Sequence, residues 1–158
     1  MSRRFLSLML PALLGFAGPA TAQTDPAPIT LTKASLSGAR FVVLPARVEG
    51  DTNVVSSVQL QQAVAAINRN LPVSLKGRYP GATITTDVND AGAVRVTPVL
   101  VAPKALNIFN QLDARLELQM PGDARTYVVK RSYGLLSLVT AGGNADMVVL
   151  NGLTTQLP

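Results

Sequence analysis

The clearest hydrophobic pattern lies in the second half of the chain, where apolar and polar positions alternate. From 112 to 120 every second residue is apolar, and the residues between them are mostly charged or polar. A period of two is typical of a strand with one buried and one wet face. The segment 121–124 then predicts a type II′ turn with Gly122 at its first central position. The resulting hairpin would pair Leu118 with Tyr127 on the apolar face.

An amphipathic helix is predicted upstream of this hairpin. Its apolar positions recur at spacings of four, three and four residues, which places them on one helical face. Ser56 or Ser57 can cap the first turn, and Pro72 ends the helix or begins an irregular continuation. We therefore expect a helix over Ser57–Leu71 that packs on a sheet through Leu60, Val64, Ile67 and Leu71.

Shorter runs complete the predicted sheet. The apolar run 41–44 is a buried strand, and the runs 82–88 and 94–101 are two further strands, with Pro98 marking an edge or a bulge. Residues 31–37 are expected to add a weak edge strand. The run 135–139 is ambiguous.

The C-terminal segment is open between two structures. Asn144 can cap a helix with Met147, Leu150, Leu153 and Leu157 on one face, but a strand over 147–150 is an alternative because Gly152 weakens the helix.

Together these elements predict an α+β fold. A mainly antiparallel sheet of four to six strands is covered on one face by the predicted amphipathic helix, with a further C-terminal helix as one option. The alternative is a β-sandwich in which the helix is an insertion.

The first 22 residues have the pattern of a secretory signal peptide. Arg3 and Arg4 precede a short apolar run, and Ala20-Thr21-Ala22 is an Ala-x-Ala cleavage site. The chain is therefore divided into a signal peptide (1–22), a linker (23–30) and one domain (31–158). We expect the product to be exported to the periplasm or the extracellular space.

Composition excludes several classes of function. The sequence contains no Cys and no His, so it offers neither a lipid attachment site nor the usual ligands and general bases. We therefore expect no metal, no cofactor and no enzymatic activity. After cleavage 12 basic and 9 acidic residues remain, without Trp, which is too mild a charge for a nucleic-acid partner. No apolar stretch of the processed chain is long enough to span a membrane.

Two basic clusters are candidate contact sites for a protein partner. Lys76, Arg78 and Tyr79 lie in the segment 74–81, which its composition predicts to be an exposed loop. A basic strip across the hairpin is formed by Arg115, Arg125 and Lys130, together with Arg131. The alternative interpretations are an ordinary solvated loop and charges that protect a sheet from edge pairing.

The order of the elements resembles a recurring domain of bacterial envelopes. The run Phe41-Val42-Val43-Leu44-Pro45 corresponds to the apolar first strand of those domains, and the predicted helix to the one that packs on their sheet. On this pattern the chain is similar to small α/β domains of the curli-secretion lipoprotein family and to the amino-terminal domain of the Tol-system propeller protein. The resemblance implies a scaffold or interaction role and transfers no catalytic residue. The missing Cys departs from the lipoprotein members.

We therefore expect an exported, non-enzymatic envelope protein that acts through contacts with a partner protein. The alternative is a small-ligand binder with an apolar pocket between helix and sheet. A pocket with convergent polar groups would favour the binder, whereas a free sheet edge or an exposed apolar strip would favour the partner-binding role.

Overall fold

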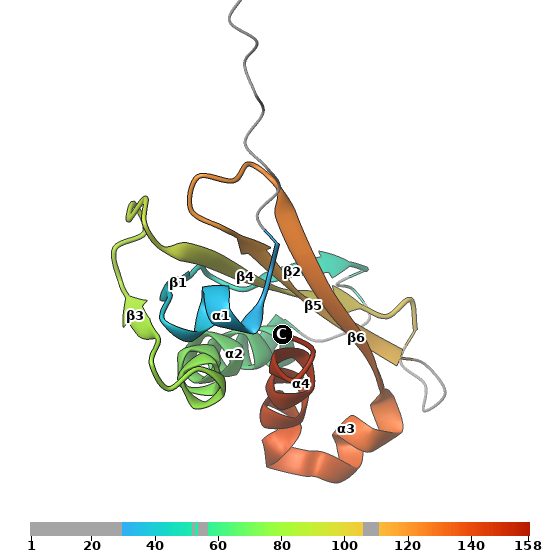
Figure 1. Cartoon of the computed structure of the whole chain (residues 1–158). Coiled ribbons are helices and arrows are strands. Elements are labelled where there is room, and N and C mark those ends of the chain that lie inside the picture. The colour runs from blue at the N-terminus through green and yellow to red at the C-terminus, as the bar shows by residue number, and fades with distance from the viewer. Residues whose placement is uncertain (1–29, 52, 54–56, 106–110) are drawn as a thin grey trace, which may run out of the picture.

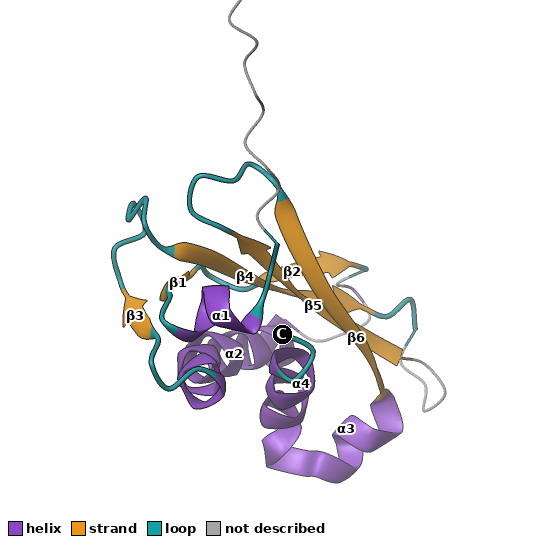
Figure 2. Cartoon of the chain, in the orientation of Figure 1, coloured by secondary structure: helices purple, strands orange, loops and turns teal. Residues whose placement is uncertain are grey.

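A six-stranded sheet with helices on one of its faces forms the structure (Figure 1). This computed structural model describes residues 30–51, 53, 57–105 and 111–158. The predicted signal peptide and residues 23–29 of the linker lie outside the described residues. The α+β class predicted from the sequence is confirmed, as Figure 2 shows from the distribution of helices and strands.

The sheet is mixed, and its longest ladders are antiparallel. Its strand order is β3-β1-β4-β5-β6, and β2 also pairs with β4. Strand β5 pairs antiparallel with both β4 and β6. Strand β1 pairs in parallel with both β3 and β4, and β2 pairs in parallel with β4. The strands are β1 (Arg40–Val43), β2 (Arg47–Gly50), β3 (Thr83–Thr85), β4 (Val94–Ala102), β5 (Gln111–Gln119) and β6 (Thr126–Gly134).

Strands β1 and β2 lie end to end along the same edge of β4. Val43 is level with Val96 and Arg47 with Val99, so the three residues 44–46 of one edge oppose the two residues 97–98 of the other. Pro98 lies in this gap. The Val96 carbonyl accepts a hydrogen bond from the Leu44 N–H, so the backbone polar groups of Val96 point toward β1. Residues two apart in a strand point these groups to the same side, so those of Pro98 point toward the β1–β2 edge as well. The missing N–H of Pro98 therefore costs no ladder bond, and Pro98 lies inside the sheet and not at an edge.

The hairpin of β5 and β6 has the predicted register. Leu118 lies opposite Tyr127, and the ladder continues without interruption to Gln111 and Gly134. The turn itself differs from the prediction. The Asp123 N–H donates to the Met120 carbonyl, so the central residues are Pro121 and Gly122, and Gly122 has a φ of 73°. Proline followed by a glycine of positive φ is the pattern of a type II turn.

Residues 33–37 form a short helix where an edge strand was predicted. In α1 (Lys33–Ser37) the Thr32 hydroxyl accepts from the Ser35 N–H, and the Ser35 hydroxyl accepts from the Thr32 N–H. This reciprocal capping box satisfies two N–H groups that a helix start leaves without partners. It also places Leu36 in the core.

The long helix α2 (Ser57–Arg78) passes through Pro72 as a regular helix, where the sequence predicted its end or an irregular continuation. Leu71 and Leu75 are fully buried, so the apolar face continues on both sides of the proline. Proline removes one helical hydrogen bond, and burial of the next turn compensates for that loss. Ile67 is buried on the same face, as predicted, and Val64 is half-buried; the Leu60 side chain lies outside the described residues.

The C-terminal segment is helical, which decides the alternative left open by the sequence. The chain forms α3 (Leu135–Ala141), a 3₁₀ turn (Gly142–Asn144) and α4 (Ala145–Thr154). Asn144 occupies the N-cap position, but its side chain makes no capping bond. Leu150 and Leu153 are buried in the core that α2 and α4 share with the sheet, whereas Met147 is only partly buried.

Gly152 is required by the way α4 packs on β6. The Tyr133 hydroxyl donates to the Val149 carbonyl at 2.7 Å, and the Tyr133 ring lies directly over Gly152. A Cβ at Gly152 would come within 3.0 Å of ring carbons Cε1 and Cζ. The glycine that weakened the helix prediction is thus explained by a close contact across the core.

We predict that Gly152→Ala lowers the free energy of unfolding by about 1–3 kcal/mol, because the added methyl overpacks the Tyr133 ring. Gly77→Ala is the matched control in α2, where a Cβ would meet no atom within 4 Å. Alanine's higher helix propensity should make that variant more stable by about 0.5–1 kcal/mol. Urea denaturation of both variants measures the difference, and equal shifts would contradict the contact.

Candidate functional site

The face of the sheet turned away from the helices is polar, and we call it the open face. All described helices lie on the other side (Figure 1). In β4 and β5 the alternate side chains enter the core cluster, and those between them point to the open face. The open face consists of Arg47 and Glu49 (β2), Arg95, Thr97, Val99 and Val101 (β4), Asp113, Arg115, Glu117 and Gln119 (β5), and Thr126, Val128, Lys130 and Ser132 (β6).

Ion pairs link β2 to β5 across the middle of the open face. Arg115 donates through Nη2 to Glu49 Oε1 at 2.7 Å and through Nε to Glu117 Oε1 at 2.9 Å. Arg47 donates to the other Glu117 oxygen at 2.5 Å. These long side chains cross over β4, where Val99 is only 1% exposed beneath them. Arginine stems commonly cover apolar surface while the charged group stays in water.

The two glutamates stabilise the charged form of Arg115. The hydrogen bond to Glu117, and next the bond to Glu49, raise the pKa of Arg115 above its ordinary value. Each glutamate has an arginine partner, so the network is internally neutralised. It organises the open face and leaves no free carboxylate pair for acid–base chemistry within it.

Two shallow hollows flank the ion-pair network. The first has a volume of about 440 Å³ and includes Arg95, whose Nη2 donates to the Val88 carbonyl and which forms no ion pair in the described residues. The second has a volume of about 460 Å³ and lies over Asp113, Lys130 and Ser132. The open face is thus an irregular polar surface and not a deep pocket.

Strand β6 is the outer strand of the sheet and pairs only with β5 in the described part of the chain. The backbone directions follow from the register. The backbone N–H and C=O groups of Val96 point toward β1, so those of Thr97 and Val99 point toward β5. The backbone groups of Leu116, opposite Pro98, then point toward β6. The backbone groups on the outer edge of β6 therefore belong to the residues with open-face side chains, which include Val128, Lys130 and Ser132.

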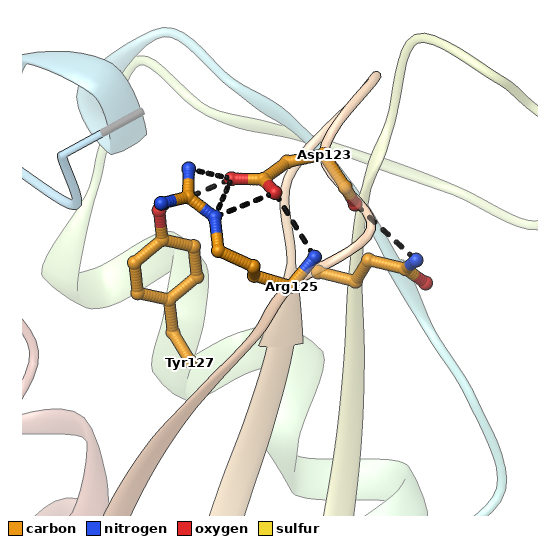
Figure 3. Close-up of polar contacts among 4 residues, drawn as sticks. Asp123, Arg125 and Tyr127 are labelled. Atoms are coloured by element: carbon orange, nitrogen blue, oxygen red, sulfur yellow. Dashed lines mark hydrogen bonds and ion pairs between the residues drawn. The ribbon is translucent and has the colours of Figure 1, made fainter. Parts of the chain in front are cut away.

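Asp123 organises the tip of the hairpin (Figure 3). Its carboxylate accepts from the Arg125 side chain, with Nη2 at 2.7 Å, from the Arg125 backbone N–H and from the Tyr127 hydroxyl. The Asp123 carbonyl also accepts from Gln119. These bonds, the Arg125 side chain foremost, hold the pKa of Asp123 far below its ordinary value.

The first predicted contact cluster is not an exposed loop. Lys76 and Arg78 are exposed side chains of the last turn of α2, and Tyr79 is buried at 1% exposure. The Tyr79 ring stacks on Phe41, and burial raises the pKa of its hydroxyl. Its hydroxyl and the Arg78 guanidinium donate to the last two backbone carbonyls of the chain. Arg78 and Tyr79 therefore fasten the C-terminal end to α2, and Tyr79 is not available to a partner.

The second predicted cluster is only partly brought together. Arg115 and Lys130 are register partners on the open face, whereas Arg125 belongs to the hairpin tip and pairs with Asp123. Sequence reasoning missed Glu49, the partner of Arg115 on β2. Nothing in the local pattern of 47–50 reveals that this segment lies on the far side of β4 from β5.

A more apolar cavity lies between the helices and the sheet. It has a volume of about 450 Å³ and is lined mainly by small and aliphatic side chains of α2, α4, β4 and β5. Gln62 and Asp146 are its polar side chains, and Asp146 already accepts from Asn70 at 2.7 Å. Convergent polar groups, which would identify a specific small ligand, are therefore few.

Neither a metal centre nor a membrane span is found in the described residues. No three His, Cys, Asp or Glu side chains within 30–51, 53, 57–105 and 111–158 gather in a way that could hold a metal ion. The helices of those same segments are too short or too polar to cross a bilayer.

Comparison with known proteins places the chain in no family. No family model matches the sequence, and no curated protein matches it. A Helicobacter pylori protein described as a neuraminyllactose-binding hemagglutinin homologue has 10% identity and a TM-score of 0.47, over 85% of this chain and 89% of that one. A hypothetical protein from Chlamydia trachomatis has 10% identity and a TM-score of 0.40, over 76% and 91%.

We predict that Asp123→Asn lowers the free energy of unfolding at pH 7. A depressed carboxyl pKa adds stability above the unfolded-state value of about 3.9, and this contribution is lost as the pH falls through the lower folded-state pKa. The difference between the two proteins should therefore shrink as the pH falls below about 4.

Urea titrations from pH 7 to pH 2 check this prediction. Asp51→Asn serves as the control, because Asp51 is an exposed turn residue that forms no ion pair in the described residues. An Asp123→Asn difference that does not change with pH would show that the tip is held by something other than the carboxylate charge.

Proposed function

We propose that this chain is an exported protein of a bacterial envelope that acts by binding another protein through the open face and the outer edge of β6. The observation that carries the proposal is the nine-residue strand β6, which pairs on one side only in the described part of the chain. A strand with unpaired backbone groups is a template for another strand.

The side chains along this edge support a contact surface. Val128 is 51% exposed and lies next to the ion-pair network. Lys130 is exposed as well and forms no ion pair in the described residues. An exposed apolar residue beside an unpaired charge gives a partner both contact area and a charged position to match.

Export is the second part of the proposal and rests on the sequence. The basic start, the short apolar run and the Ala-x-Ala site of residues 1–22 support it. A non-enzymatic role is supported by the composition, since His and Cys are absent. The carboxylates on the open face are occupied by arginines or, for Asp113, by the Ser132 hydroxyl.

Site-specific photocrosslinking in the native host tests the proposal. We predict that a photoreactive residue at Val128 forms a discrete covalent product with another envelope protein. The same residue at Val73, a 67% exposed valine on α2, should form no such product, because it lies on the helical side of the molecule. The crosslinked chain should begin at Gln23 and be recovered from the periplasmic or extracellular fraction.

Three results would contradict the proposal. Equal crosslinking at Val128 and Val73 would place the contact elsewhere. The absence of any product at Val128 would remove the edge as a binding surface. A cytoplasmic protein that retains residues 1–22 would exclude export.

The second candidate function is the binding of an apolar small molecule, and the cavity of about 450 Å³ between helix and sheet favours it. We predict for this candidate that an apolar fluorescent probe binds to the folded protein and that Ala66→Phe, which fills the cavity, abolishes binding. Ala65→Phe is the control, because Ala65 is an exposed neighbour that does not line the cavity. Equal binding by both variants would exclude the cavity as the site.

A further inference from the structure

The outer edge of β6 has the properties of a strand that accepts another strand. The ladder with β5 runs through nine consecutive pairs without a bulge, and β6 contains no proline. Bulges, prolines and short length are three devices that prevent edge pairing, and β6 uses none of them. The protective feature that β6 does carry is charge, on Lys130 and Arg131, which an oppositely charged strand would neutralise. Its outward backbone groups lie on Thr126, Val128, Lys130, Ser132 and Gly134, as the register requires.

Both sides of this edge are positively charged. Lys130 lies on the open face, and Arg131 lies on the opposite face, over the Tyr133 ring. Neither forms an ion pair in the described residues. The acidic side chains nearby are engaged elsewhere: Asp113 accepts from Ser132 at 2.5 Å, and Glu117 holds two arginines.

A second copy of β6 is a poor partner for this edge. The strand reads TYVVKRSYG and contains no acidic residue. Pairing two copies would bring two lysines and two arginines together without a carboxylate, and like charges across a strand pair are destabilising. An incoming strand with carboxylates would instead neutralise Lys130 and Arg131.

We propose that the edge of β6 binds an extended acidic segment of a partner protein, which adds a further strand to the sheet. The segment has an acidic residue opposite Lys130 and an apolar residue two positions away, opposite Val128, because residues two apart in a strand share a face. A second acidic residue beside the first faces Arg131. This inference rests on the proposed function and specifies the chemistry of its partner.

The probe is an acetylated and amidated peptide, Thr-Val-Thr-Glu-Glu-Thr-Val-Thr. It reads the same in both directions, so either strand orientation presents the required spacing. The control peptide has lysine in place of both glutamates. A second control carries N-methyl groups on alternate residues, which remove backbone donors without changing the charge.

Amide NMR of the chain from Gln23 to Pro158 gives the readout. We expect the glutamate peptide to shift and protect from exchange the amides of Val128, Lys130 and Ser132. Neither control peptide should do so. Binding should weaken as salt is raised, and Lys130→Glu should weaken it by about tenfold or more. Lys76→Glu, an exposed charge reversal on α2, should leave binding unchanged.

Each opposing result overturns the inference. Equal binding of the glutamate and lysine peptides, no binding of either, or protected amides outside β6 would each contradict an acidic strand partner. Dimer formation through β6 in sedimentation experiments would assign the edge to a second copy. If Val128 still crosslinks to an envelope protein while the glutamate peptide fails to bind, the proposed function stands and only the acidic strand is wrong.

Discussion

The pairing of β4 on both of its edges is the constraint on which the rest of the structure depends. One edge carries β1 and β2 in parallel, and the other carries β5 in antiparallel. Strands that share a neighbour lie about 10 Å apart. That distance allows the arginines and glutamates of β2 and β5 to meet above Val99. The break between β1 and β2 lies beside Pro98, which has no N–H for a ladder bond.

The helices cover only one face of the sheet, so one face is apolar and buried and the other is polar and exposed. Leucines of α2 and α4 pack against the apolar face, and Tyr133 fixes α4 on β6 through its hydrogen bond to the Val149 carbonyl. The open face is left to charged residues, which neutralise one another in the middle. Like Arg95 in β4, Lys130 and Arg131 at the outer edge form no ion pair in the described residues. The strand that pairs on one side only and these two positive charges are therefore both features of β6.

Prediction from the sequence succeeded where structure follows from near neighbours along the chain. The period of two over 112–120 indicated which side chains of β5 are buried. The register of Leu118 with Tyr127 was predicted from a type II′ turn, and it is correct although the turn itself has Pro121 and Gly122 at its centre. The buried Ile67–Leu71 face of α2 followed from its period of 3.6 in the same way. The basic residues Arg115 and Lys130 were found because they alternate with this apolar pattern.

What the sequence by itself determined was therefore the α+β class, the hairpin and the buried face of the long helix, because each depends on local periodicity. Only the tertiary structure decided that α2 continues past Pro72, since the gain comes from burying Leu75 against distant strands. Contact with Phe41 and Pro158 made Tyr79 a core residue. The partners of Arg115 were decided in the same way, because the ion pair with Glu49 joins residues 66 positions apart and no local pattern encodes that distance.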